Sequence, residues 1–199
     1  MSDLSFPVVH LADGTPVLIR PMRPDDRAAV VEAFRRLSPD SRYYRFWSRR
    51  EGVSEKLLQR FLHPEPGLHE TWVAQDPERP GEPGYGGGSY WRSEKDPQTA
   101  EISLVVADEA QHRGLGTLLL ALVWVRAYQV GVRCFYGHVL PDNYSVLDWF
   151  RALGAEMHYQ SGEYWFLLPL QLEKLRDTPS SHRLVAWVQR LVDMRELQL

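Results

Sequence analysis

A glycine-punctuated turn constrains what this 199-residue chain can fold into more than any other stretch. Residues 111–116 read Gln-His-Arg-Gly-Leu-Gly and interrupt an otherwise apolar part of the sequence. Before the turn, residues 101–107 alternate in polarity and contain several β-branched side chains, which predicts a strand. After it, residues 117–129 are rich in leucine and too long for a strand, which predicts a buried helix. The centre of the chain is therefore expected to run from strand to tight turn to helix.

The turn also has the composition of an anion-binding site. Backbone N–H groups at the start of a helix point toward one spot, and the helix dipole favours negative charge there. Gly114 and Gly116 permit positive φ angles and let a ligand approach the backbone. Arg113 can add a positive charge, and Gln111 can add a side-chain amide. The stretch lacks the Lys-Ser/Thr pair of a nucleotide P-loop and the third glycine of a dinucleotide-binding turn. By itself, Gly-x-Gly indicates only a backbone requirement.

The wider pattern is more specific, because Glu101 is followed by Gln-x-x-Gly-x-Gly and then by an apolar helix. It resembles the acetyl-CoA-binding motif of the GNAT superfamily of N-acetyltransferases. The resemblance implies a mixed α/β (α+β) fold, with a bent and mostly antiparallel sheet of about seven strands flanked by helices. It also implies acetyl-CoA as acyl donor, with its pyrophosphate on the amides of the turn and its pantetheine arm beside the preceding strand. The implied coenzyme-binding residues are Val105, Val106, Gln111, His112, Arg113, Gly114, Leu115, Gly116 and Thr117.

Transfer of an acetyl group to an amine requires a group that removes a proton from that amine. A lysine amine has an ordinary pKa of about 10.4 and is protonated at neutral pH. A partly buried carboxylate, its pKa raised by desolvation, can accept the proton. Glu101 stands where lysine acetyltransferases of the superfamily carry a catalytic Glu, so the resemblance implies a general base. From the residues alone, an ordinary salt bridge at a strand end explains Glu101 at least as well. The strand amide near Val106 is the expected donor to the tetrahedral intermediate.

A second helix is expected at residues 144–153, with Asn143 before it as an N-cap. The cap alone explains Asn143, whereas the resemblance implies that it also contacts the coenzyme. Phe150, also implied to contact the coenzyme, occupies the position where many GNAT enzymes carry a Tyr that protonates the departing thiolate. Two interpretations remain open: no acid is used, or Tyr144 or Ser145 takes that role from the start of the same helix.

A narrower resemblance concerns the acceptor. Residues 37–46, together with Ile-Arg-Pro at 19–21, are similar to the acetyltransferase domain of bacterial Pat-type protein lysine acetyltransferases, which act on acyl-CoA synthetases. This implies a protein lysine as acceptor. A small amine is the alternative substrate, and a non-catalytic acyl-CoA-binding sensor is the alternative function. The same segment is also explained as a connector between helices that places aromatic side chains in the core, namely Tyr43, Tyr44, Phe46 and Trp47.

The rest of the chain supplies further strands and helices. Asp13-Gly14 between two apolar runs predicts a hairpin at residues 8–20. Three successive glycines at residues 86–88, inside a predicted strand, indicate either a bulge or a close approach of another backbone. The other expected helices cover residues 28–37 and 53–62, and the other expected strands cover residues 70–75, 84–93, 132–140, 155–160 and 163–168.

We expect an acetyltransferase domain at residues 1–169 and a C-terminal extension at residues 170–199. Helical spacing of apolar residues at 170–176 and 182–197 predicts two helices in the extension. Packing of the extension on the same domain is the first expectation and a dimer contact is the second. The chain is accordingly expected to be a monomer or a homodimer.

Composition argues against several other classes of function. A net charge of −3 gives no electrostatic basis for binding nucleic acid. The sequence has neither a charged-then-apolar leader nor an apolar run of about 18 residues, so we expect no membrane contact and a cytoplasmic location. The single Cys134 suits a reducing compartment and is expected to be a small buried hydrophobe. The seven histidines show no metal-ligand spacing, so no metal is expected.

Overall fold

One mixed sheet passes through the whole molecule. The structure, a computed structural model, describes residues 8–46 and 53–194. The strands of the sheet are β1 (Val8–His10), β2 (Pro16–Pro21), β3 (His69–Gln75), β4 (Gly86–Arg92), β5 (Thr99–Val106), β6 (Cys134–Val139), β7 (Glu156–Gln160) and β8 (Glu163–Pro169). Their spatial order is β1-β2-β3-β4-β5-β6-β8-β7, and only the pairing of β5 with β6 is parallel. This confirms the mixed, mostly antiparallel sheet, with eight strands rather than about seven.

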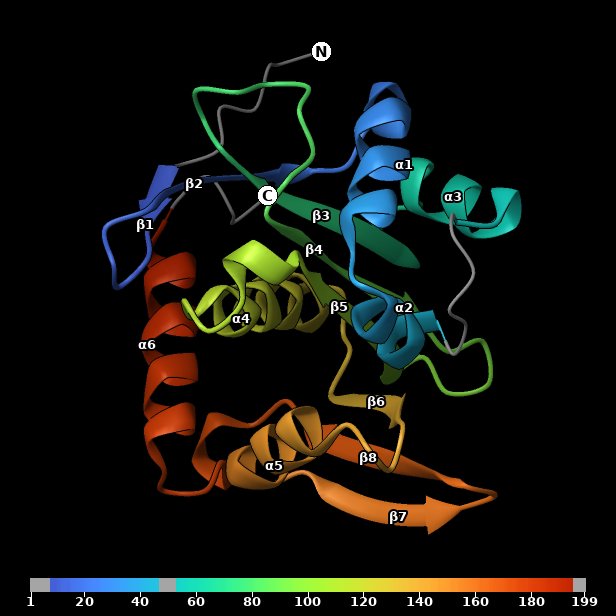
Figure 1. Cartoon of the computed structure of the whole chain (residues 1–199). Coiled ribbons are helices and arrows are strands. Elements are labelled where there is room, and N and C mark those ends of the chain that lie inside the picture. The colour runs from blue at the N-terminus through green and yellow to red at the C-terminus, as the bar shows by residue number, and fades with distance from the viewer. Residues whose placement is uncertain (1–7, 47–52, 195–199) are drawn as a thin grey trace.

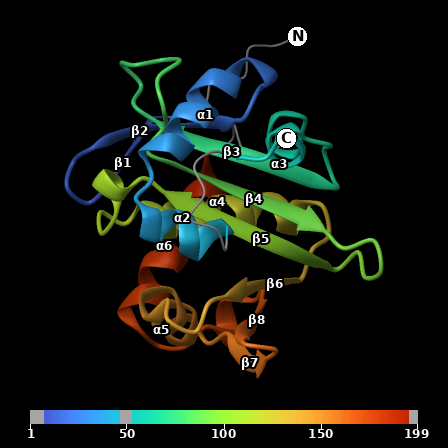
Figure 2. The same ribbon diagram turned by 45° about the vertical axis from the view of Figure 1, so that its right-hand side comes forward.

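Helices cover both faces of this sheet. In the described residues, the α-helices are α1 (Arg27–Arg36), α2 (Pro39–Phe46), α3 (Glu55–Leu62), α4 (Leu115–Gln129), α5 (Tyr144–Leu153) and α6 (Pro179–Asp193). Short 3-10 helices are η1 (Pro24–Asp26), η2 (Asp108–Ala110) and η3 (Leu172–Lys174). Figure 2 shows α1, α2 and α3 in front of the sheet and α4 behind it. Figure 1 shows α6 running beside α4, against which it packs.

The helix α4 forms the centre of the main hydrophobic core. Every residue from 117 to 125 is buried, because the sheet covers one side of α4 and α6 covers another. A helix that is covered on several sides needs no polar stripe, which explains why its sequence is apolar all round. The helix therefore holds the strands β4 and β5 in place and fixes the position of the turn that precedes it.

The glycines at residues 86–88 mark a close approach and not a bulge. They pair with β5 in unbroken register, Gly86 opposite Val106 and Gly88 opposite Leu104. A Cβ added to Gly86 would lie 2.5 Å from the Val105 carbonyl oxygen and 3.2 Å from Leu119 of α4. The absence of a side chain at Gly86 therefore lets α4 and β5 pack tightly against β4.

Other predicted boundaries need correction. The helix predicted at residues 170–176 is wrong, since only the short turn η3 forms there. The last helix α6 begins at Pro179, earlier than expected, because the Thr178 side chain accepts a hydrogen bond from the Ser181 N–H and proline favours the first helical position. A further helix, α2, forms inside residues 37–46, where a connector was the alternative.

The sequence also predicts that several aromatic residues and Cys134 are buried. Tyr43 and Tyr44 are partly buried. Trp47 and the side chain of Phe46, also expected in the core under that alternative, lie outside the described residues, as do residues 195–199. Cys134 is partly buried, and this burial raises the pKa of its thiol.

We expect the substitution Gly86→Ala to lower the free energy of unfolding by about 1–3 kcal/mol, since the new methyl group can be accommodated only by moving the β5 backbone. Urea denaturation at constant m value measures the loss. The matched control is Gly87→Ala on the opposite face of β4, where the nearest atom to a new Cβ is the Trp72 carbonyl oxygen at 3.1 Å. Equal losses in the two variants would contradict the explanation.

Candidate functional site

The sheet divides between its two central strands. The parallel pairing of β5 with β6 extends only from Thr99 opposite Cys134 to Glu101 opposite Tyr136. Beyond this point β5 continues beside β4 to Val106, whereas β6 continues beside β8. The gap is part of a cleft of about 1020 Å³, lined along one side by β5 residues 101–106. On this side β5 presents backbone N–H and C=O groups that have no strand partner in the described part of the chain.

Most of the side chains and backbone segments predicted to form a site meet in this cleft. Those that line it are Glu101, Val105, Val106, Gln111, His112, Gly116, Thr117, Asn143, Ser145 and Phe150. Four predicted residues do not line it: Arg113, Gly114, Leu115 and Tyr144. Leu115 is buried in the core, and Tyr144 is 70% exposed. The structure therefore brings the turn, the end of β5 and the start of α5 together around one cavity.

The turn before α4 has the backbone conformation of an anion site. Gly114 is the N-cap of α4 with φ of 86°, and His112, a non-glycine residue, has φ of 60°. No side chain caps the free N–H groups at the start of α4. Gly114 is exposed, and the nearby residues Gly116 and Thr117 line the cleft, so the start of α4 borders open space. Free helix N–H groups beside open space are the donors that a phosphate group needs.

Arg113 is held by the N-terminal hairpin. Its Nε donates to Asp13 Oδ2 at 2.6 Å, and its Nη2 donates to the Thr15 hydroxyl. The Thr15 N–H and hydroxyl and the Arg113 guanidinium together lower the pKa of Asp13 from 3.8 to about 2. Arg113, which the sequence analysis assigned to the anion site, is therefore paired with the Asp13 carboxylate. This pair connects the turn to the hairpin of β1 and β2.

A second cluster joins the turn to the start of α2. Asp108 accepts hydrogen bonds from the Ser38 N–H and hydroxyl and from the Ser41 hydroxyl. Burial alone would raise the pKa of Asp108, but the hydrogen bonds from Ser41 and Ser38 outweigh it and lower the pKa. The Gln111 amide donates to Ser41 and to the Val106 carbonyl, so it is engaged inside the protein. Sequence reasoning missed this cluster because it joins residues 70 positions apart.

Glu101 lies at the point where β5 and β6 separate. It is partly buried and shares the face of β5 with Ser103 and Val105, whereas Leu104 on the other face is directed toward α4. Burial, and secondarily the negative charge of Glu101, raise the pKa of the neighbouring Tyr136 phenol. In the described residues no Arg, Lys or His forms an ion pair with Glu101. The salt bridge offered as the alternative explanation of Glu101 is therefore absent from this part of the chain.

An aromatic surface adjoins Glu101 on β6 and β8. The rings of Tyr136 and Trp165 stack with centroids 6.4 Å apart, and the His138 ring lies 3.7 Å from that of Trp165. His138 Nδ1 lies 3.2 Å from a carboxylate oxygen of Glu163, and both residues line the cleft. Trp165 is 36% exposed. The alternation of Tyr136 and His138 along β6 could have revealed this surface from the sequence.

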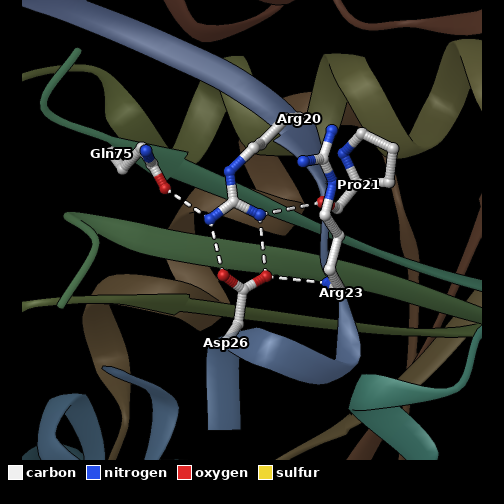
Figure 3. A network of polar contacts seen from close by, with 5 residues as sticks. All are labelled: Arg20, Pro21, Arg23, Asp26 and Gln75. Carbon is white, nitrogen blue, oxygen red and sulfur yellow. Dashed lines mark hydrogen bonds and ion pairs between the residues drawn. The ribbon is translucent and has the colours of Figure 1, made fainter. Parts of the chain in front are cut away.

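A small cavity of about 80 Å³ lies between α1 and the sheet, and it shares Ser103 and Val105 with the cleft. Arg20, Asp26 and Gln75 line one side of it. Figure 3 shows the polar network that these side chains form. The Arg20 guanidinium donates two hydrogen bonds to Asp26, at 2.7 and 2.6 Å, and one to the Gln75 side chain at 2.7 Å. Asp26 also accepts from the Arg23 N–H. The network fastens the start of α1 to β2 and β3 and so fixes the roof of the cavity.

Within residues 8–46 and 53–194, no group of three or more His, Cys, Asp and Glu side chains is arranged to hold a metal ion. None of the helices described there has the length and apolar character required to cross a bilayer.

Comparison with known proteins gives a match over most of the chain. Residues 17–156 match the acetyltransferase (GNAT) domain family. The chain is also 29% identical over 147 residues to acetyltransferase Pat of Mycolicibacterium smegmatis, an alignment that covers 74% of this chain and 43% of Pat. The chain therefore spans less than half the length of that relative.

Two solved structures share the fold. The GNAT domain of S. lividans PAT superposes with a TM-score of 0.75 at 25% identity, covering 85% of this chain and 99% of that domain. The protein yncA of Salmonella typhimurium, solved with its cofactor acetyl-CoA, superposes with a TM-score of 0.62 at 20% identity, covering 78% of this chain and 94% of yncA. These matches confirm the GNAT fold and the closeness to Pat-type acetyltransferases that the sequence motifs implied.

We expect the substitution Arg113→Ala to raise the pKa of Asp13 from about 2, though not to 3.8, because the hydrogen bonds from Thr15 remain. A carboxylate whose folded-state pKa is lowered stabilises the fold above its unfolded pKa, and this contribution is lost as pH falls from 3.8 toward 2. Carboxyl carbon NMR shifts recorded during an acid titration measure the pKa. Glu55, whose pKa is lowered to about 2 chiefly by Arg27, is the internal reference. An unchanged Asp13 pKa would show that Arg113 is not held by the hairpin.

Proposed function

This chain belongs to the GNAT family of acetyltransferases, and we propose that it transfers the acetyl group of acetyl-CoA to a lysine side chain of another protein, with Glu101 as general base. GNAT acetyltransferases use acetyl-CoA, and the related yncA structure contains it. The uncapped amides at the start of α4, where Gly116 and Thr117 line the cleft, fit a pyrophosphate. The unpaired side of β5 fits the amides of a pantetheine arm.

The observation that carries the proposal is the position of Glu101. Its carboxylate is partly buried in the cleft where β5 leaves β6, and no cation in the described residues neutralises it. A carboxylate in this environment can accept the proton that an ammonium group must lose before it attacks. The amine nitrogen then forms a bond to the thioester carbonyl carbon, and the carbon–sulfur bond breaks. A β5 backbone N–H near Val106 donates to the oxyanion that forms between these two events.

The departing thiolate obtains little help from α5. Phe150 is buried and stacks on Phe166 with ring centroids 4.0 Å apart, so the position has no proton donor. Tyr144 is exposed and outside the cleft, whereas Ser145 lines it. Of the two substitutes that the sequence offered, Ser145 is therefore the one whose position suits the role. A thiolate can also leave without an acid, because it is a fairly weak base whose conjugate thiol has a pKa of about 8.5.

A protein acceptor is favoured by the surface beside Glu101. The stacked rings of Tyr136 and Trp165 are partly exposed. The Glu163 carboxylate lies beside His138, whose ring contacts Trp165. Aromatic faces and carboxylates attract an ammonium group on an aliphatic stem. Similarity to Pat adds support for a protein acceptor such as an acyl-CoA synthetase, and the single Cys134 for a cytoplasmic setting.

A small amine is the second candidate acceptor. It is favoured by the cavity under α1, which adjoins the cleft at Ser103 and Val105 and is lined on one side by Arg20 and Asp26. A space of about 80 Å³ suits a small apolar group and is too small for a protein segment.

The substitution Glu101→Gln is expected to lower kcat by roughly 10²- to 10⁴-fold and to leave the affinity for acetyl-CoA unchanged, since it removes the proton acceptor but keeps the shape. Release of free coenzyme A thiol measures turnover, and calorimetry measures binding. Glu109→Gln is the control, because Glu109 is an exposed acid that does not line the cleft. Full activity in Glu101→Gln would exclude Glu101 as the base.

The acceptor is identified with the same assay and a panel of an acyl-CoA synthetase, a lysine-containing peptide and small amines. Turnover with the protein or peptide is the expected result. Turnover with small amines alone would replace the protein acceptor by the second candidate. Coenzyme binding without turnover on any acceptor would favour an acyl-CoA sensor.

A further inference from the structure

The anion site lacks the cation that its sequence seemed to provide. Arg113 extends to Asp13 and Thr15 in the hairpin between β1 and β2, where its charge is paired. The amides of the turn remain available for a pyrophosphate. Coenzyme A carries a further phosphate on its ribose, at the end of the molecule away from the thiol, and that group has no partner among the residues predicted from the sequence.

The C-terminal helix α6 lies outside the residues that match the family and borders the cleft. It packs against α4 and α5 (Figure 1). Its first turn is fastened to the end of α5, because the hydroxyl groups of Thr178 and Ser181 donate to the Ala152 carbonyl at 3.0 and 3.5 Å. Thr178 also caps the helix. The second turn of α6 is therefore held in a defined position beside the groove between α4 and α5.

Arg183 brings a positive charge from this helix to the cleft. It lines the cleft together with Thr117 of α4 and Trp149 of α5. Its side chain is exposed, and its Nη2 donates to the Ser180 hydroxyl at 3.2 Å. In residues 8–46 and 53–194 no carboxylate forms an ion pair with it. A guanidinium group has five N–H donors in a planar fork, so most of them remain for a ligand.

We propose that Arg183 binds the 3′-phosphate of coenzyme A, so that the C-terminal helix completes the coenzyme site. This inference depends on the proposed function for the identity of the ligand. The turn amides before α4 hold the pyrophosphate, and the ribose phosphate lies beyond it toward α6. Arginine binds phosphate oxygens through paired, charge-assisted hydrogen bonds, which makes it the residue type suited to this group.

The test compares coenzyme A with dephospho-coenzyme A, which lacks only the 3′-phosphate. Binding of each to the full chain is measured by calorimetry, without any acceptor. The wild type is expected to prefer coenzyme A. The substitution Arg183→Ala is expected to lower the affinity for coenzyme A by roughly five- to tenfold, the effect of losing one exposed, charge-assisted hydrogen bond. The affinity for dephospho-coenzyme A is expected to stay unchanged. Arg183→Lys is expected to retain part of the preference, because it keeps the charge without the planar fork.

The matched control is Arg190→Ala on the same helix. Arg190 is equally cationic and exposed, but it stacks over Trp187 at 5.0 Å and does not line the cleft. It is expected to leave both affinities unchanged. The proposal would be overturned if the Arg183→Ala variant bound coenzyme A with normal affinity, or if its affinity for both ligands fell by the same factor. Because no acceptor is present, a wrong assignment of the acceptor or of Glu101 would leave this result intact, whereas absence of binding by the wild type would refute the proposed function itself.

Discussion

The short parallel pairing of β5 with β6 is the constraint on which the rest of the structure depends. It ends at Glu101 and Tyr136, because β5 remains with β4 while β6 remains with β8. Helix α4 supports the first part of the sheet from behind, and α5 packs on β8 in the second part. The two parts therefore separate at a defined residue, and the groups at that point are a partly buried carboxylate, an unpaired strand edge and the start of a helix.

Contacts between distant segments then decide the shape of the cleft. Asp108 holds the start of α2 against the turn, and Arg113 holds the N-terminal hairpin against its other side. The Arg20–Asp26 network fastens the start of α1 to β2 and β3. Each of these contacts uses hydrogen bonds between charged groups or to one, which are stronger than hydrogen bonds between neutral partners. The turn is thus a fixed part of the protein before any ligand arrives.

Much of this fold could be predicted because its signals are local. The strand, turn and helix around Gly114 follow from periodicity and glycine spacing over about 30 residues, and the capped helix after Asn143 agrees with the structure at both ends. The helix predicted at residues 170–176 failed because apolar spacing alone cannot distinguish a helix from an irregular segment whose leucines pack against the core.

Long-range contacts could not be predicted in the same way. Asp13 lies 100 residues before Arg113, and no local sequence pattern indicates that the two side chains pair. The charge of Arg113 was therefore assigned to the ligand. Arg183 was overlooked for the opposite reason: it lies on an ordinary amphipathic helix, and only the packing of α6 on α4 and α5 brings it to the cleft. Local patterns identify a backbone site, whereas the side chains that surround it depend on the tertiary structure.

The unpaired side of β5 gives this protein an open sheet edge in its interior. Such an edge on a protein surface invites pairing with a strand of another chain. Here the edge lines a cleft of about 1020 Å³ that α5 and the turn before α4 also border, and its N–H and C=O groups suit a ligand that carries amide groups. A ligand of that kind would complete the sheet as its missing strand, and its amides would continue the ladder between the two halves.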